Sequence, residues 1–197
     1  MLASTYAAAF LIYSNPHLFA FSRKTDQLVW MGMIFLLTFI MPVVWVILMK
    51  KLELIDSLHL IDRKERIIPY IATATFYLWT FMLFKPGAHA NLFANRYLSL
   101  MMLGATFAVF IGFFVNIFAK ISLHTIAAGG FIALAMIMMG ISDYDLKLFL
   151  VAVVLLSGLI GTARLILEAH TEPEVLWGYA AGFIGQYIAF FIVPRFF

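Results

Sequence analysis

One short polar segment of this chain carries the residue types that chemistry on a phosphate requires. Residues 164–174 read Arg-Leu-Ile-Leu-Glu-Ala-His-Thr-Glu-Pro-Glu and separate two long apolar runs. Arg164 can grip a phosphate with a bidentate fork of N–H donors. His170 can attack phosphorus as a neutral imidazole and form a phosphohistidine. Glu174 can accept the N–H of that ring and fix its tautomer. The spacing therefore predicts an anion site with a histidine nucleophile.

A second polar segment, residues 120–124 (Lys-Ile-Ser-Leu-His), also lies at a break between apolar runs. Lys120 offers a compact positive charge, and Ser122 is a residue type that starts helices. A protonated His124 can hand a proton to a departing alkoxide. One histidine as nucleophile and one as acid form a complete set for hydrolysis of a phosphomonoester. We expect no metal or other cofactor, because the cations supply the electrostatic stabilisation.

The elements that must position these residues are membrane helices. The 197-residue chain is 64% hydrophobic and 12% charged, whereas soluble domains are about 25% charged. Its length suits a single integral-membrane domain over residues 1–197 and leaves no room for a second, soluble domain. No basic run alternates with aromatic residues on a polar surface, so we expect no nucleic-acid partner. The chain has no cysteine, which excludes disulfides, a thiol nucleophile and a thiolate metal site.

Apolar runs long enough to span a bilayer recur along the chain. A hydrocarbon core of about 30 Å needs about 20 apolar residues in a helix. The sequence predicts an all-α, polytopic transmembrane bundle with six membrane helices, at residues 28–49, 68–84, 97–118, 123–141, 147–167 and 174–194. A further N-terminal run, residues 2–21, is interrupted by Asn15-Pro16-His17. We expect it to be a seventh crossing or a broken, re-entrant segment.

Seven crossings would place the loops alternately on two membrane faces. Face A would hold the N-terminus and residues 50–67, 119–122 and 168–173, and face B would hold residues 22–27, 85–96 and 142–146 and the C-terminus. Both polar segments then fall on face A, together with the longest polar loop, which contains Arg66. The 13 Lys and Arg residues divide almost evenly between the faces, so the positive-inside rule does not orient the protein.

Two helix starts are expected to point at face A. Ser122 is expected at the start of one helix and Thr171 at the start of the last one, with Pro173 in its first turn. Helix N-termini carry free N–H groups and a partial positive charge, so they attract anions. Together with Lys120 and Arg164, these helix ends predict a site for a doubly charged phosphate.

Each of these residues also has a purely structural interpretation. Thr171-x-x-Glu174 fits a capping box, and cations such as Lys120 and Arg164 commonly extend from helix ends to the membrane interface. A single histidine is more often packed or interfacial than catalytic. Close helix packing, rather than ligand binding, is the expected role of the glycines at 158, 161, 178 and 182. The functional hypothesis therefore depends on complementary residue types occurring together on face A.

The spacing Arg164-x5-His170-x3-Glu174 resembles the last signature of the type 2 phosphatidic acid phosphatase family, which reads Ser-Arg-x5-His-x3-Asp. Ala163 replaces the serine and Glu174 replaces the aspartate. The members of this family are integral-membrane lipid phosphatases. The whole resemblance covers about residues 120–182, roughly a third of the chain.

The family's middle signature, Pro-Ser-Gly-His, is matched by Ser122-x-His124, with Ile121 and Leu123 at its other two positions. The first signature, Lys-x6-Arg-Pro, is not present intact. Arg66 near Pro69 is a substitute for its missing arginine, and Lys120 is a substitute for its lysine.

The resemblance implies a role for each matched residue. His170 would be the nucleophile that becomes phosphorylated, with Glu174 as the hydrogen-bonding partner of its ring. His124 would protonate the leaving group. The phosphate would be bound by Arg164, Lys120, Ser122 and Arg66.

The function implied by the resemblance is hydrolysis of a lipid phosphate through a phosphohistidine. The substrate would be phosphatidic acid, phosphatidylglycerol phosphate or a polyprenyl diphosphate, and the partners would be that lipid and the bilayer. The resemblance also implies a bacterial inner membrane, with the site facing outward. Two alternatives stay open: a lipid phosphotransferase that uses the same histidine, and a non-catalytic protein that binds or transports an anionic lipid. The sequence does not set the oligomeric state.

Overall fold

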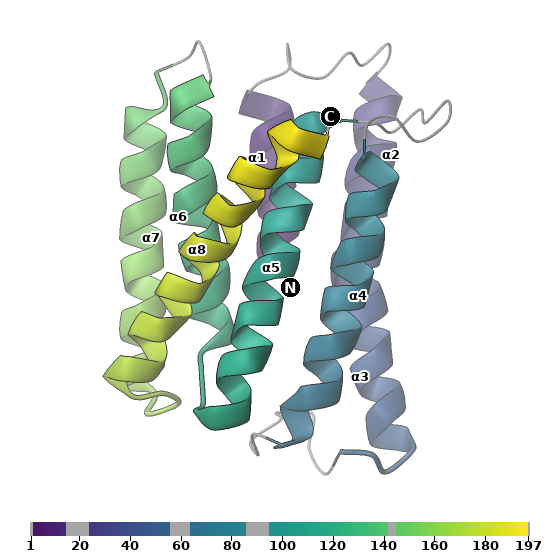
Figure 1. The fold of residues 1–197 in the computed structure, drawn as a ribbon, viewed down its shortest axis with the longest axis vertical. Coiled ribbons are helices and arrows are strands. Elements are labelled where there is room, and N and C mark those ends of the chain that lie inside the picture. Colours follow the sequence, from purple (N-terminus) through teal and green to yellow (C-terminus); the bar gives the residue numbers. More distant parts are fainter. Residues whose placement is uncertain (1, 15–23, 56–63, 86–94, 142–144, 197) are drawn as a thin grey trace.

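The computed structural model describes residues 2–14, 24–55, 64–85, 95–141 and 145–196. Most of these residues lie in helices, and none of them lies in a β-strand. In chain order the helices are α1 (Leu2–Ser14), α2 (Lys24–Phe35), the π-helical η2 (Leu36–Ile40), α3 (Met41–Lys51), the 3-10 turn η3 (Lys64–Arg66), α4 (Ile67–Phe84), α5 (Arg96–Phe118), α6 (Leu123–Ile141), α7 (Lys147–Ile166) and α8 (Glu172–Phe196). Figure 1 shows them as one upright bundle.

Six helical segments of the described chain are long and apolar enough to cross a membrane, which confirms the predicted bundle of an integral membrane protein. The first of them, Thr25–Lys51, joins α2, η2 and α3 into one continuous span. Pro42 lies in the first turn of α3. Because proline has no N–H to donate to the preceding turn, the local hydrogen bonding is irregular and the helix widens into the π turn η2.

The N-terminal helix α1 is shorter than the six spans. It has 13 residues, so at about 1.5 Å per residue it covers about 20 Å, less than a bilayer core. In Figure 1 it occupies the upper half of the bundle, and its C-terminal end lies near the start of α2. Helix α1 by itself therefore does not make a seventh full crossing. Residues 15–21 of that run lie outside the described residues.

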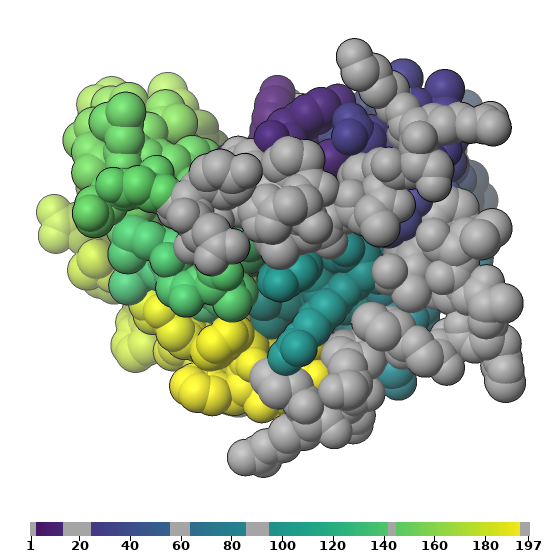
Figure 2. Space-filling model, turned by 90° about the horizontal axis from the view of Figure 1, so that it is seen from above, coloured from purple at the N-terminus to yellow at the C-terminus, as the bar shows by residue number. Residues whose placement is uncertain are grey.

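The junctions fall at two ends of the bundle, as the alternation of spans predicts. The end of α3, the α5–α6 junction and the α7–α8 junction lie at the lower end in Figure 1, which is face A. The start of α5 and the end of α8 lie at the upper end, face B. Seen from face B in Figure 2, α8 (yellow) and α1 (purple) lie on opposite sides of the bundle, with part of α5 (teal) between them.

Glycines allow α8 to pack closely against α6. A Cβ on Gly182 would collide with the Ile126 carbonyl, and one on Gly178 would collide with the Thr125 hydroxyl. Reciprocally, a Cβ on Gly129 of α6 would collide with the backbone of Tyr179. Small residues of this kind let helix backbones approach each other in membranes. The α6–α8 contact therefore fixes the relative position of the two segments that carry the predicted site.

The packing roles predicted for the other two glycines have different outcomes. Gly161 of α7 faces the Tyr179 side chain, whose hydroxyl a Cβ at that position would crowd. The Tyr179 hydroxyl donates a hydrogen bond to the Ser157 carbonyl oxygen. Gly158 has nothing within 4 Å of a Cβ position. The prediction of close packing is confirmed for Gly161 and wrong for Gly158, which faces away from the bundle.

Candidate active site at the α6–α8 junction

The two polar segments, which are more than forty residues apart in the sequence, meet at face A. The Lys120 ammonium donates a hydrogen bond to the Ala169 carbonyl oxygen, with an Nζ–O distance of 2.9 Å. The backbone N–H of Ser122 donates to the Glu174 carbonyl oxygen at 3.4 Å. These two bonds tie the start of α6 to the start of α8, so the predicted histidines belong to one end of the same helix pair.

A tight turn after α7 brings His170 back toward Arg164. Glu168 adopts a left-handed backbone conformation with φ of 50°, a common way to end a helix. The backbone N–H groups of Ala169 and His170 both donate to the Arg164 carbonyl oxygen, at 3.1 and 3.4 Å. Helix α8 then starts at Glu172, with Pro173 in its first turn as predicted.

His170 and Glu174 form the closest polar pair of the site. His170 Nδ1 lies 2.7 Å from Glu174 Oε2, and the two side chains are only 9% and 20% exposed. An ionised carboxylate can only accept hydrogen bonds, so Nδ1 carries the proton and donates it to Glu174. The lone pair of Nε2 is then free. The carboxylate thus binds the ring of His170, which is the contact that their spacing predicts.

The pKa of His170 lies below its ordinary value of 6.5. Desolvation by burial is the main cause, and the positive charges of Lys120 and Arg66 act in the same direction. Glu174 opposes them, because its hydrogen bond and its negative charge both favour the protonated ring. The net result is a neutral imidazole near pH 7, which is the form that can act as a nucleophile.

His124 lies on the exposed side of the first turn of α6. It is near enough to both Arg164 and His170 for their charges to act on it. The ring is therefore placed beside the nucleophile rather than on the far side of the bundle. Arg164, in the last turn of α7, completes this side of the site.

Arg66 reaches the same region from a distant part of the sequence. It ends the short turn η3 before α4 and is half-buried. Its charge acts on His170 from η3, whereas that of Lys120 acts from the α5–α6 junction. Hydrogen bonds and charge interactions thus connect six of the seven predicted residues at this end of the bundle: His170, Glu174, His124, Arg164, Lys120 and Arg66.

Ser122 is placed differently from the other six. It directly precedes α6, as predicted, but its side chain is completely buried against α8. Its Oγ has no hydrogen-bond partner among the described residues. Its carbonyl oxygen accepts bonds from the Thr125 hydroxyl and the Ile126 N–H. The residue therefore lies beneath the surface of the site, where its backbone connects α6 to α8.

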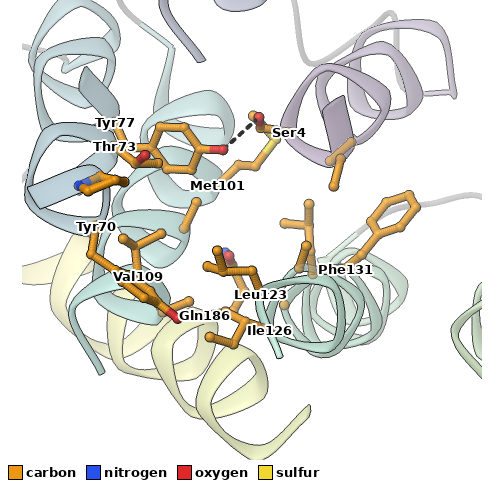
Figure 3. A pocket seen from close by; sticks show the side chains of 18 of the residues that line it. Ser4, Tyr70, Thr73, Tyr77, Met101, Val109, Leu123, Ile126, Phe131 and Gln186 are labelled. Atoms are coloured by element: carbon orange, nitrogen blue, oxygen red, sulfur yellow. Dashed lines mark hydrogen bonds between the residues drawn. The ribbon is translucent and has the colours of Figure 1, made fainter. Parts of the chain in front are cut away.

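A cavity inside the bundle lies next to this cluster, and Figure 3 shows it between α4, α5, α6 and α1. Arg66 forms part of its wall, as does Leu123, the neighbour of His124. One feature of the sequence, the spacing of four polar residues along η3 and α4, could have indicated this cavity. Arg66, Tyr70, Thr73 and Tyr77 recur at the spacing of one helix face and all line the cavity.

The polar side chains of the cavity wall are mostly satisfied within the protein. The hydroxyls of Tyr77 and Ser4 lie 3.3 Å apart and share a hydrogen bond (dashed in Figure 3). Gln186 of α8 donates to the Leu100 carbonyl oxygen at 3.2 Å. The Tyr70 hydroxyl, in contrast, has no partner among the described residues. The rest of the wall is apolar, from residues such as Met101 and Phe131.

Comparison of the chain with protein-family models, with curated proteins and with solved structures finds no match in any of the three. The geometry of the site and the resemblance of its short motifs to the phosphatase signatures are therefore what indicate a function.

Proposed function

We propose that this protein is a membrane lipid phosphatase that works through a phosphohistidine on His170. The observation that carries the proposal is the 2.7 Å contact between His170 Nδ1 and Glu174 Oε2. It leaves the opposite ring nitrogen unprotonated, within range of the charges of Lys120 and Arg66. A nucleophile with a fixed tautomer, set among cations, is the arrangement that attack on a phosphate dianion requires.

In the first chemical step, His170 Nε2 attacks phosphorus. The P–N bond forms while the bond from phosphorus to the lipid oxygen breaks, and the electron pair of that bond goes to the leaving oxygen. The protonated ring of His124 gives its proton to this oxygen, so that the lipid leaves as an alcohol. Arg164, Lys120 and Arg66 stabilise the negative charge on the equatorial oxygens of the phosphoryl group.

In the second step, water resolves the phosphohistidine. His124, now neutral, accepts a proton from the water as the water oxygen attacks phosphorus. The P–N bond breaks, and its electron pair returns to Nε2 of His170. For a phosphomonoester the products are the lipid alcohol and inorganic phosphate, and for a diphosphate the lipid leaves as its monophosphate instead. Both histidines regain their starting protonation states. Glu174 holds the Nδ1 proton throughout and stabilises the positive charge that the ring of His170 carries as it is phosphorylated.

The setting of the site favours a lipid substrate. The cations gather at one end of a bundle of membrane-spanning helices, where the headgroup of a phospholipid would lie while its chains stay in the hydrocarbon region. The motif resemblance supports a phosphorylated lipid such as phosphatidic acid, phosphatidylglycerol phosphate or a polyprenyl diphosphate. The same resemblance favours a bacterial inner membrane, with face A on the outer side.

The deciding experiment measures phosphate release from a panel of lipid phosphates by the purified protein. His170→Ala and His124→Ala should each reduce the rate at least about a hundredfold, the usual contribution of a positioned acid, base or nucleophile. Ala152→Cys changes an exposed residue of α7 and controls for losses of activity during expression and purification of a variant. It should keep the wild-type rate. Full activity in both histidine variants would refute the mechanism.

A second measurement separates hydrolysis from transfer. With a radiolabelled lipid phosphate, the His124→Ala protein should accumulate label on His170, because departure of the lipid can still occur slowly while water is no longer activated. Addition of glycerol or a lipid alcohol should not divert the label in the wild-type protein. Acceptor-dependent formation of a new phosphate ester would favour the phosphotransferase, and absence of both label and release would favour a lipid-binding protein.

A further inference from the structure

The cavity beside the site is bounded on the side of face B by the short helix α1. Ala3, Ser4 and Ala7 line it from α1, while Tyr77 lines it from α4. In Figure 3, Ser4 and Tyr77 meet across the gap between these helices. The space open to the centres of water-sized molecules is about 140 Å³, similar to an apolar cavity of about 150 Å³ that accepts a benzene-sized guest. The space is thus suited to part of one hydrocarbon chain.

The two ends of the cavity differ chemically. At the end near face A the wall includes Arg66, whose charge also acts on His170. Away from Arg66 the described wall carries no charged side chain, and the Ser4 and Tyr77 hydroxyls satisfy each other. An occupant with an anionic head and an apolar chain matches this polarity in one orientation only, with its head toward the histidines.

The wall of α4 indicates how far a chain can extend. Arg66 and Tyr77 lie at opposite ends of the lining stripe, eleven residues apart in the sequence. A helix rises about 1.5 Å per residue, so the distance along α4 is about 16 Å. Ala3 and Ala7 line the cavity on either side of Ser4, whose hydroxyl meets that of Tyr77 at the end of the stripe away from Arg66. Larger side chains there would shorten the space.

We propose that this cavity binds one hydrocarbon chain of the phosphorylated lipid, and that Ala3 and Ala7 of α1 set the chain length that it accepts. The inference rests on the proposed function for the identity of the head, and on the cavity itself for the chain. In this arrangement α1 is a specificity element: its first turns act as the stop against which the end of the chain lies.

The first test is a chain-length series of linear alkyl phosphates, measured by calorimetry with the protein in amphipol, where no bilayer competes for the chain. Each methylene that leaves water for an apolar site improves affinity by up to about fourfold. Affinity should therefore rise with chain length and then reach a plateau when the chain meets α1. Ala7→Leu should move the plateau to shorter chains and weaken binding of the longer ones by about tenfold.

Matched variants control for indirect effects. Ala3→Leu should act in the same direction as Ala7→Leu, because both residues line the cavity. Ala152→Leu makes the same change on the exposed side of α7 and should leave the whole curve unchanged. If the plateau stays at the same chain length in both α1 variants, the proposal is overturned.

A reversible block keeps the test valid if the leucine variants fold poorly. The wild-type chain has no cysteine, so Ala7→Cys provides a single thiol in the cavity. Modification of this folded protein with a butyl thiosulfonate should abolish binding of dodecyl phosphate, and a reductant should restore it. Dodecyl phosphate should also slow the modification, whereas inorganic phosphate should not. Equal protection by both, or by neither, would overturn the proposal.

The binding series and the phosphate-release measurement can fail separately. A plateau that moves with Ala7→Leu in a protein that releases no phosphate would refute the phosphatase and support the chain site. Phosphate release that depends on His170, with an affinity curve that no α1 variant changes, would support the phosphatase and refute the chain site.

Discussion

The ring of His170 receives opposite influences from residues of different helices. Burial, Lys120 and Arg66 lower its pKa, while Glu174 raises it through a hydrogen bond and a negative charge. In the proposed mechanism the neutral ring is the nucleophile, so activity should fall as the pH falls through this pKa. Because the pKa lies below its ordinary value of 6.5, the acidic limb of the rate profile is expected below that pH.

Substitutions of the charged neighbours should move this limb in opposite directions. Glu174→Gln removes the influence that raises the pKa, so the acidic limb of kcat/KM should shift to lower pH while kcat falls by about a hundredfold. Lys120→Met removes an influence that lowers the pKa, so its limb should shift to higher pH. The measurement is the pH dependence of phosphate release by each variant. Shifts of the same sign in both would contradict the electrostatic account.

At this scale the sequence predicts much of the site but not all of it. The spacing of His170 and Glu174 is enough to predict their contact, because the intervening residues start a helix. The burial of the Ser122 side chain was not predictable, because it depends on which face of α8 packs against the start of α6. The position of Arg66 relative to His170 depends on how η3 and α4 approach α6, which no local pattern in the sequence encodes.

Among the elements, the packing of α6 against α8 matters most for the site. Both histidines lie at the start of, or just before, one of these two helices. Their mutual position depends on backbone contacts such as that of Gly182 with the Ile126 carbonyl. The six spans and their ends are predictable from the lengths of the apolar runs. The contacts of individual glycines are not, because they depend on how far each helix is rotated about its axis.

The α6–α8 contact can be tested with two glycine substitutions. Gly182→Ala should destabilise the protein by about 1–3 kcal/mol, the usual cost of overpacking, because the added methyl group meets backbone that cannot move aside locally. Gly158→Ala has open space around it and should be neutral or stabilise the helix by about 0.5–1 kcal/mol. Thermal unfolding in detergent measures both. Equal effects would show that the Gly182 contact does not hold α6 and α8 together.

For the whole molecule, the important property is that the charged groups of the site gather at one end of the bundle. The sequence predicts that these charged groups lie at the same end, because each span brings the chain to the opposite membrane face. The cavity was not predicted, because no single element encloses it. Its lining comes from α1, η3, α4, α5, α6 and α8, and only the arrangement of all six in space defines its volume.

Sidedness is directly measurable because the wild-type chain has no cysteine. Leu52 is exposed at the end of α3, Thr171 is exposed directly before α8, and Asp145 is exposed before α7. A membrane-impermeant maleimide added to sealed vesicles should label Leu52→Cys and Thr171→Cys from the same side and Asp145→Cys from the other. Labelling of Leu52→Cys and Thr171→Cys from opposite sides would contradict the topology and, with it, the convergence of Arg66 on His170.

The bonds from Lys120 to Ala169 and from Ser122 to Glu174 also impose an order on biogenesis. During synthesis, the first five spans emerge from the ribosome before the partners of these two residues exist. Lys120 therefore lacks its hydrogen-bond acceptor, and the start of α6 lacks its bond to α8, until α8 has left the translocon and packed against α6. A nascent chain that stalls before this final insertion therefore lacks the bond from Ser122 to α8, however many of its spans are already in place.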